Sequence, residues 1–425
     1  MKIEKRHKRI IENIFSLGII SGLNILIPLV TLPYLIRTVG IDNYGAYAIV
    51  YAMIHYGILF SSYGFSYSTT QQIAQNRDNK EVINHIVHAT LTARILIMLI
   101  ISLIMGIVCI IVYPIQYFIM YLWGLGMIIG DILNPIWLYQ GMEKMRFMTI
   151  VNLISKSVFT ALIFIFIRKE SDYPYITLLN SIGYIIAGSV SLIMAYRYFD
   201  LHPLIPKRCH IIHQFKSGWY IFLSTISMTL YRNSNVFILG FFLPSGLVGI
   251  YDGAEKVIKA FQVIINPVSS ALFPHIARSF KNRSFSLQWQ TIKRLSKIMS
   301  ILLILLSGIA FFTAPLANRI LLDNQETGAI ELIRIMTPVI FFGGLNYILG
   351  IVGLVNAGEK KSFFHCVMTS GISSILLLLI LVKPFGLYSG GIAMVICELS
   401  LFIMCMCVWK RKINSIHSKN ITSYE

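Results

Sequence analysis

The feature that most constrains this chain is a series of apolar runs of about 20 residues each, which recur along its whole length. A helix of that length crosses the hydrocarbon core of a bilayer, which is about 30 Å thick. Charged residues make up only 13% of the 425 residues, whereas a soluble protein carries roughly 25%. Much of the surface must therefore face lipid, and we expect an all-α integral membrane protein.

The runs predict about twelve transmembrane helices, with the N and C termini on the cytoplasmic side. The expected spans are 12–36, 45–65, 89–112, 117–139, 148–167, 176–196, 217–241, 249–273, 296–315, 332–354, 364–382 and 389–409. Of the 36 Lys and Arg residues, 25 fall in the connections on one side, five on the other, and six within spans. Basic residues accumulate in cytoplasmic connections. This asymmetry sets the orientation, and it explains the net charge of +18 without a nucleic-acid partner.

The longest polar connections suggest two lobes. We expect an N-terminal six-helix lobe over 1–200, a cytoplasmic linker over 201–216, and a C-terminal six-helix lobe over 217–425 with a short basic cytoplasmic tail. Three short echoes indicate a repeat: Gly45-Ala46-Tyr47 with Gly249-Ile250-Tyr251, Gln72-Ile73-Ala74 with His275-Ile276-Ala277, and Gly141-Met142-Glu143-Lys144 with Ala357-Gly358-Glu359-Lys360. Because six spans is an even number, the lobes share one orientation. A pseudo-two-fold axis along the membrane normal, with a cleft between the lobes, is then expected.

Three stretches carry a family resemblance. They are Leu32-Pro33-Tyr34-Leu35-Ile36-Arg37-Thr38-Val39-Gly40 followed by Tyr44-Gly45, then Asn134-Pro135-Ile136-Trp137-Leu138-Tyr139-Gln140-Gly141-Met142-Glu143-Lys144-Met145, and finally Gly249-Ile250-Tyr251 through Ala254-Glu255-Lys256 to Ala271-Leu272-Phe273-Pro274. With them the chain resembles the Wzx-type polysaccharide-unit (O-antigen) flippases of the multidrug/oligosaccharidyl-lipid/polysaccharide exporter superfamily, over essentially its whole length.

The resemblance implies a MATE-like fold and a flippase of the bacterial inner (cytoplasmic) membrane. Its substrate would be an undecaprenyl-diphosphate-linked oligosaccharide, moved from the cytoplasmic to the periplasmic leaflet by alternating access. The product would serve O-antigen, capsule or exopolysaccharide synthesis, and a polysaccharide polymerase is a further expected partner. The resemblance does not fix which sugar is carried.

Six basic residues lie within the expected spans, where a charge is a functional hypothesis by default. Arg94 and Arg334 lie close to span ends and are expected to snorkel to the interface. The other four are candidate substrate contacts: Arg232, Lys156, Lys259 and Lys256. Lys256 and Lys259 each follow an acidic residue by four positions, so a structural pair is the alternative reading for both. Arg232 has no acidic residue near it in sequence and is the first choice for a diphosphate contact.

Two carboxylates within spans, Asp131 and Glu398, are candidates for coupling to H⁺ or Na⁺. The alternative for each is a neutral or salt-bridged group that pins neighbouring helices together, and we favour it. Pro135 lies close to Asp131 and is expected to break the helix locally.

A polar aromatic face is expected on the second span. Tyr44, Tyr47, Tyr51 and His55 follow one another at intervals of three or four residues, so they share one side of a helix. Tyr47, Tyr51 and His55 are candidates for stacking on, and hydrogen bonding to, the sugars. Packing within the helix bundle is the alternative.

Other classes are less well supported. No phosphate-binding loop for ATP appears, no cofactor motif is found, and the histidines around Cys209 lack metal-site spacing. A MATE-like drug exporter for cationic drugs would require an acidic cleft, yet the spans hold more basic than acidic residues. A peptidoglycan-precursor flippase is separated from the leading hypothesis only by the resemblance. A membrane sugar polymerase or glycosyltransferase would need catalytic groups in its loops, and the short outer connections offer none, so no enzyme is expected.

Overall fold

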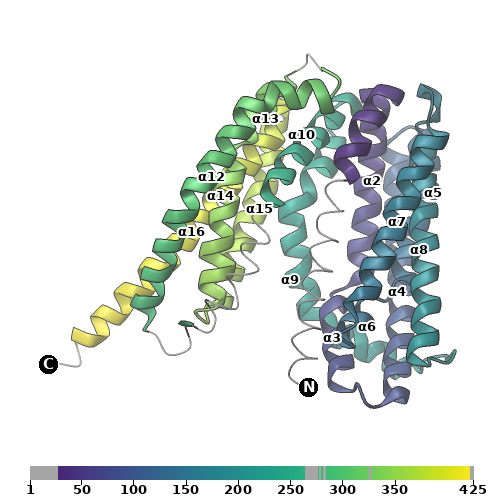
Figure 1. Cartoon of the computed structure of the whole chain (residues 1–425), viewed down its shortest axis with the longest axis horizontal. Coiled ribbons are helices and arrows are strands. Elements are labelled where there is room, and N and C mark those ends of the chain that lie inside the picture. Colours follow the sequence, from purple (N-terminus) through teal and green to yellow (C-terminus); the bar gives the residue numbers. More distant parts are fainter. Residues whose placement is uncertain (1–26, 264–275, 277–278, 281–283, 325–327, 422–425) are drawn as a thin grey trace. The chain divides into compact units, whose positions relative to one another are not determined.

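The computed structural model describes residues 27–263, 276, 279–280, 284–324 and 328–421, without the side chains of 145, 220–221, 224–233 and 414–421. Helices dominate these residues and no strand occurs among them (Figure 1). Nine helices in this part of the chain are long and apolar enough to cross a membrane. The prediction of an all-α membrane protein is confirmed.

The chain divides into two compact units, Met1–Ile226 and Ser227–Glu425. In the first unit a helix over 27–39 precedes seven α-helices and one short 3-10 turn. They are α2 (Ile41–Ser62), α3 (Phe65–Gln75), α4 (Lys80–Val112), α5 (Ile115–Leu133), α6 (Ile136–Gly141), α7 (Met145–Phe166), η1 (Glu170–Asp172) and α8 (Tyr175–Phe199). Helix α5 is central, since it packs against α2, α4 and α8. Most of the first expected span, 12–36, lies outside the described residues.

Helix α9 (Arg208–Gly240) begins in the first unit and ends in the second. The remaining elements are α10 (Ser245–Val263), α12 (Phe285–Leu321), α13 (Ala329–Met336), α14 (Pro338–Asn346), the π-helix η2 (Tyr347–Val355), α15 (Lys360–Phe385) and α16 (Tyr388–Ile421). Helix α10 is not among the nine apolar helices because four charged residues lie within its 19. The expected span 249–273 runs past the end of α10 into residues that are not described.

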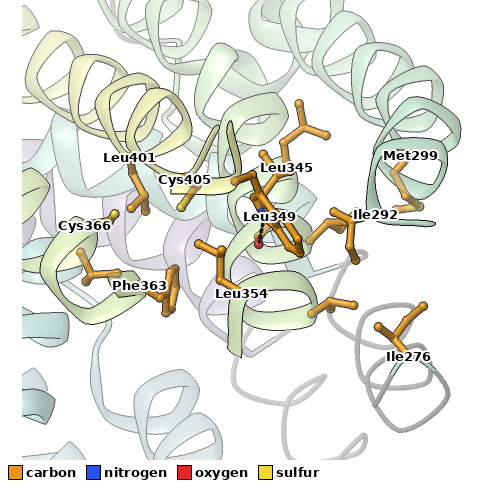
Figure 2. Packing of buried hydrophobic residues seen from close by; sticks show 14 of the residues in the cluster. Ile276, Ile292, Met299, Leu345, Leu349, Leu354, Phe363, Cys366, Leu401 and Cys405 are labelled. Carbon is orange, nitrogen blue, oxygen red and sulfur yellow. Dashed lines mark hydrogen bonds between the residues drawn. The ribbon is translucent and has the colours of Figure 1, made fainter. Parts of the chain in front are cut away.

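An apolar core holds the second unit together. Figure 2 shows side chains of α12, α14, η2, α15 and α16 meeting in one cluster, among them Ile292, Leu349, Phe363 and Leu401. Trp409 is fully buried there, and its indole N–H donates to the carbonyl oxygen of Leu349 at 3.2 Å. The one polar atom of this large side chain is thereby satisfied inside the core.

The outward faces of the long helices carry apolar side chains that a soluble protein would bury. On α4 these include Leu99, Ile100, Leu103, Ile107 and Ile111, and on α12 Ile301, Ile304, Leu305 and Phe312, all exposed. Exposed apolar surface of this extent marks a membrane-facing protein. The lipid environment predicted from composition is therefore visible as rows of exposed Leu, Ile and Phe.

The internal repeat is visible in one turn of each unit. Three backbone hydrogen bonds close the first turn, Met142 to Leu138, Glu143 to Gln140 and Lys144 to Tyr139, and three close the second, Ala357 to Gly353, Gly358 to Val355 and Glu359 to Leu354. Both turns are Schellman motifs with a left-handed residue, Glu143 at φ 55° and Gly358 at φ 87°. The structural repeat pairs Glu143 with Gly358, which is one residue away from the pairing expected from the sequence echo.

Both units also interrupt a helix just before that turn. In the first, α5 ends at Leu133 and α6 begins at Ile136, so Pro135 breaks the helix as predicted. In the second, α14 passes at the equivalent point into the π-helix η2. Irregular backbone within a membrane protein is tolerated where it is buried in protein or lines a cavity. The two interruptions therefore lie at corresponding places in the two units.

The contact between α5 and α8 yields a stability prediction. A side chain at Gly188 would overlap the backbone carbonyl of Gly130, so both helices depend on glycine for their close approach. We expect Gly188→Leu to destabilise the protein by at least the roughly 1–3 kcal/mol typical of overpacking, seen as loss of monodisperse protein in detergent. Gly308→Leu is the matched control, because nothing lies within 4 Å of a side chain added there. Equal yields of the two variants would contradict this role.

Candidate functional site

The predicted aromatic face of α2 is present in the structure. Ring centroids of Tyr44 and Tyr47 lie 6.1 Å apart, those of Tyr47 and Tyr51 5.5 Å, and those of Tyr51 and His55 4.6 Å. The His55 ring Nε2 and the Tyr51 hydroxyl are 2.9 Å apart, within hydrogen-bonding distance. The row runs from buried Tyr44 and Tyr47 through half-buried Tyr51 to exposed His55. One end therefore belongs to the packed interior and the other reaches the surface of the unit.

Side chains of α8 hold the buried end of this row. The amide of Asn180 donates to the Tyr47 hydroxyl at 3.2 Å, and both groups are buried. Tyr184, one turn further along α8, is hydrogen-bonded to Tyr51 and lies close to Asp131. Tyr47 is thus buried and hydrogen-bonded to α8, and its ring contacts that of Tyr51.

Asp131 forms a buried ion pair with Arg94. The guanidinium Nη2 lies 2.5 Å from the Asp131 carboxylate, and the Arg94 side chain is only 4% exposed. The expectation that Arg94 snorkels to the interface is wrong. Helix α4 begins at Lys80, so Arg94 lies about four turns inside it. The expectation for Asp131 that we favoured, a salt-bridged group between helices, agrees with this geometry.

Arg94 also repairs the helix break beside it. Proline has no N–H, so Pro135 cannot donate to the carbonyl of Asp131 four residues earlier. Arg94 Nη1 donates to that carbonyl oxygen at 3.1 Å, and Nε donates to the carbonyl of Ser61 at 3.4 Å. One guanidinium therefore joins α4, the end of α5 and the end of α2, and the Asp131 carbonyl also accepts the N–H of Asn134 at 3.3 Å.

The second unit places a different polar pair at the corresponding position. Applying the pairing of the two Schellman turns, Asn346 corresponds to Asp131. The Asn346 amide donates to the Glu398 carboxylate at 2.6 Å and to the Glu398 carbonyl at 2.8 Å. Glu398 is 7% exposed, and Asn346 Oδ1 is buried without a hydrogen-bond partner in the described residues. The fourth span pairs its polar residue with a cation, and the tenth pairs its residue with a carboxylate.

Two lysines of α10 are paired as the alternative reading anticipated. Lys256 lies 2.5 Å from the Asp252 carboxylate and Lys259 lies 2.9 Å from Glu255. Each pair brings one positive and one negative charge to the same face of the helix. The positive potential that α10 offers to a diphosphate is correspondingly reduced.

The remaining cations are placed as follows. Lys156 is half-buried on α7. Arg232 belongs to α9, and its side chain lies outside the described residues. Arg334 on α13 stacks its guanidinium on the Phe311 ring, 5.0 Å from the centroid. Among the described residues no group of three or more His, Cys, Asp or Glu side chains is arranged to hold a metal ion.

Comparison with known proteins decides the family. Residues 10–280 match the family described as "Polysaccharide biosynthesis protein". The chain belongs to this family. It is 27% identical to the "Putative O-antigen transporter" of Escherichia coli (strain K12) over 95% of this chain and 97% of that one. It is 25% identical to the "Putative O-antigen transporter" of Shigella dysenteriae over 93% and 98% of the two chains. The polysaccharide-transport family indicated by the sequence is confirmed.

Solved structures of MATE family transporters share the fold. An inward-facing conformation of a multidrug resistance MATE transporter aligns with a TM-score of 0.69, covering 94% of this chain and 96% of that one at 15% identity. An outward-facing conformation aligns with a TM-score of 0.57 over 97% and 96% at 16% identity. The MATE-like fold of this polysaccharide-family protein is therefore confirmed. A sequence identity of 15–16% shows the fold and does not show that the functions are the same.

Sequence reasoning missed several partners in the site. Arg94 was assigned to the interface, and neither Asn180 nor Tyr184 was singled out. Asn346 could have been found, because the internal repeat pairs it with Asp131 once the offset is corrected by one residue. No sequence pattern predicts the contact between Arg94 and Asp131, because the two residues lie 37 positions apart on different helices.

The Arg94–Asp131 pair yields a second stability prediction. Arg94→Gln or Asp131→Asn alone removes one half of the pair and should cost about 3–5 kcal/mol, as is typical of a broken buried pair. The double variant should cost clearly less than the sum of the two. A double-mutant cycle on thermal unfolding in detergent measures this coupling.

The control for that cycle is the exposed pair Lys80–Asp200, whose atoms are 3.0 Å apart. The hydrogen bond from Lys80 lowers the pKa of Asp200, but both side chains are solvated. Lys80→Gln and Asp200→Asn should leave the unfolding temperature almost unchanged. Additive losses in the Arg94 and Asp131 variants would show that the buried pair is not a coupled unit.

Proposed function

We propose that this protein flips an undecaprenyl-diphosphate-linked oligosaccharide from the cytoplasmic to the periplasmic leaflet of a bacterial inner membrane. The observation that carries the proposal is full-length similarity to relatives named O-antigen transporters, with family membership over residues 10–280. The MATE-like fold is compatible with it, because this fold supports transport in both inward- and outward-facing forms. Surface polysaccharide synthesis, with a polymerase as a downstream partner, is the process it would serve.

The physical task explains why such a protein needs a polar path. Each sugar hydroxyl stripped of water without a new partner costs about 2–7 kcal/mol, and an unpaired diphosphate costs far more. The polyprenyl tail stays in lipid throughout and adds no such cost. A flippase must therefore supply cations for the diphosphate and hydrogen-bonding or aromatic groups for the sugars, on a surface that lipid does not cover.

The aromatic row of α2 is the proposed sugar contact. His55 is exposed in a helix that is apolar enough to span the membrane. Polar side chains in such helices face a water-filled cavity or the bundle interior rather than lipid. Tyr51 and His55 would accordingly line the substrate path, while Tyr47, capped by Asn180, positions them. Alternating access, with one unit rocking against the other, is the proposed mechanism.

Arg232 and Lys156 are the proposed diphosphate contacts, with Lys259 and Lys256 in a secondary role because each shares its charge with a carboxylate. Single changes Arg232→Gln, Lys156→Gln and Lys259→Gln should abolish or strongly reduce surface polysaccharide in a complementation assay. Immunoblots of membranes must show normal protein levels. The control is Lys383→Gln, at an exposed position in the last turn of α15, at the end predicted to face outward. Normal polysaccharide in all three variants would remove this substrate site.

The same assay separates a flippase from a polymerase or glycosyltransferase. Cells that lack a polymerase still display single sugar units outside, whereas cells that lack a flippase retain finished lipid-linked units in the inner leaflet. Surface display of single units in a strain without this protein would therefore reject the flippase proposal.

Of the two proposed coupling sites, the geometry favours Glu398 over Asp131. Neutralising Asp131 by a proton would leave the Arg94 guanidinium buried without its counter-charge, which is costly. Glu398 instead contacts the Asn346 amide, and the Asn346 Oδ1 oxygen and the Gln262 amide lie around the same part of α14. Carboxylate and carboxamide oxygens are suitable ligands for H⁺ or a hard cation.

Coupling predicts different phenotypes for the two carboxylates. Glu398→Gln keeps the size and hydrogen bonding of the side chain, so the folded protein should persist while transport in proteoliposomes no longer responds to an imposed H⁺ or Na⁺ gradient. Asp131→Asn should lower stability first, through Arg94. A Glu398→Gln variant that still responds to both gradients would exclude this residue as the coupling site.

A further inference from the structure

A pocket of about 440 Å³ lies at one end of the first unit and plays no part in the site described above. It is a partly open hollow between the end of α3, the beginning of α4 and the beginning of α9. Its polar lining comes from the histidines His85, His210 and His213 and from carboxamides that include Gln72, Gln75 and Gln214. The volume falls within the roughly 300–1,000 Å³ typical of small-molecule sites. The charge asymmetry of the connections predicts that this end faces the cytoplasm.

The walls of the pocket are held in place by hydrogen bonds. The side chains of Gln72 and Gln214 exchange amide hydrogen bonds at 2.9 and 3.3 Å, and Gln72 also donates to the Ser217 hydroxyl at 3.0 Å. These bonds fasten α9 to α3. The rings of His85 and His210 meet edge to face with centroids 5.1 Å apart. The pocket is therefore built before any ligand arrives.

One buried atom lacks a partner at this site. His85 Nδ1 is buried and has no hydrogen-bond partner within the described residues. This nitrogen lies beneath the surface of the pocket wall, so the groups that a ligand could reach are the imidazole and carboxamide side chains that line the pocket.

The lining chemistry narrows the class of ligand. No Asp, Glu, Lys or Arg is among the lining residues, and the basic side chains near them in sequence, such as Lys80 and Lys207, are not part of the pocket. An anion would require permanent cations or several strong donors. Carboxamides and imidazoles each offer both donors and acceptors, which matches sugar hydroxyls. Val82, Ile86 and Ala89 add an apolar wall for the C–H face of a sugar ring.

We infer that this pocket binds an uncharged sugar ring. The inference rests on the proposed function, because it assigns the pocket to the carbohydrate part of the lipid-linked substrate before translocation. The diphosphate remains at the cationic positions named above, so the two parts of the headgroup are recognised by different chemistry. Selectivity among repeat units would then depend on the side chains of α3, α4 and α9 at this end.

Histidine modification tests the inference directly on the full-length protein in detergent. Diethylpyrocarbonate labels accessible imidazoles, and mass spectrometry reports each site. The probes are free glucose, galactose, rhamnose and N-acetylglucosamine, with inorganic pyrophosphate as the anionic probe. At a sugar concentration of about three times its Kd, labelling of His210 and His213 should slow about fourfold. His202, exposed at the same end but outside the pocket, should be labelled at an unchanged rate.

A matched pair of variants provides the control. Gln75→Ala removes a lining carboxamide and should abolish the sugar protection. Gln71→Ala changes an exposed residue of the same type on the same helix, outside the pocket, and should leave protection intact. Absence of protection by every sugar, protection by pyrophosphate instead, or equal slowing at His202 would each overturn the inference.

Failure of this inference is distinguishable from failure of the proposed function. Transport of lipid-linked units by wild-type protein in proteoliposomes tests the function without reference to the pocket. Transport without sugar protection would reject the pocket alone. Sugar protection without transport would reject the flippase and leave a sugar-binding membrane protein.

Discussion

Lipid offers no hydrogen bonds, so every polar group within the membrane-spanning part of this chain must find its partner in the protein itself. Arg94 shows the consequence most clearly. Its guanidinium supplies the donor that Pro135 cannot, neutralises Asp131, and reaches a carbonyl at the end of α2. Three helices of the first unit are thereby joined through one side chain. The buried charge of Arg94 therefore stabilises the helix break between α5 and α6.

The two units meet the same constraint with different chemistry. Each interrupts a helix at the equivalent place and follows it with the same Schellman turn. The polar residue before the interruption is Asp131 in one unit, paired with a cation, and Asn346 in the other, paired with Glu398. Two repeats that share a backbone conformation but differ in side chains can have different functions. We propose that the Arg94–Asp131 pair makes the first unit rigid and that Glu398 of the second unit couples transport to an ion.

The sequence predicts features that depend on residues close together in the chain, such as helices and their ends. It does not predict contacts between side chains on different helices. In the part of the chain that the structure describes, apolar runs form nine long helices, α5 ends just before Pro135, and the spacing of Lys256 and Lys259 predicts their carboxylate pairs. The row from Tyr44 to His55 followed from helical spacing alone. The burial of Arg94 could not be predicted. Helix α4 begins nine residues before the expected span, and the partner of Arg94, Asp131, lies on another helix. The repeat was detected one residue out of register, which hid Asn346.

Where polar groups are already satisfied, a substrate gains little by contacting them, because a hydrogen bond would only replace an existing one. Tyr47, held by Asn180, and Arg94, held by three oxygen atoms, belong to that class. Function is better sought where polar side chains are exposed. Two such places are His55, where the aromatic row reaches the surface, and the pocket between α3, α4 and α9. At such places a hydrated headgroup can replace its hydrogen bonds to water with hydrogen bonds to protein side chains a few at a time.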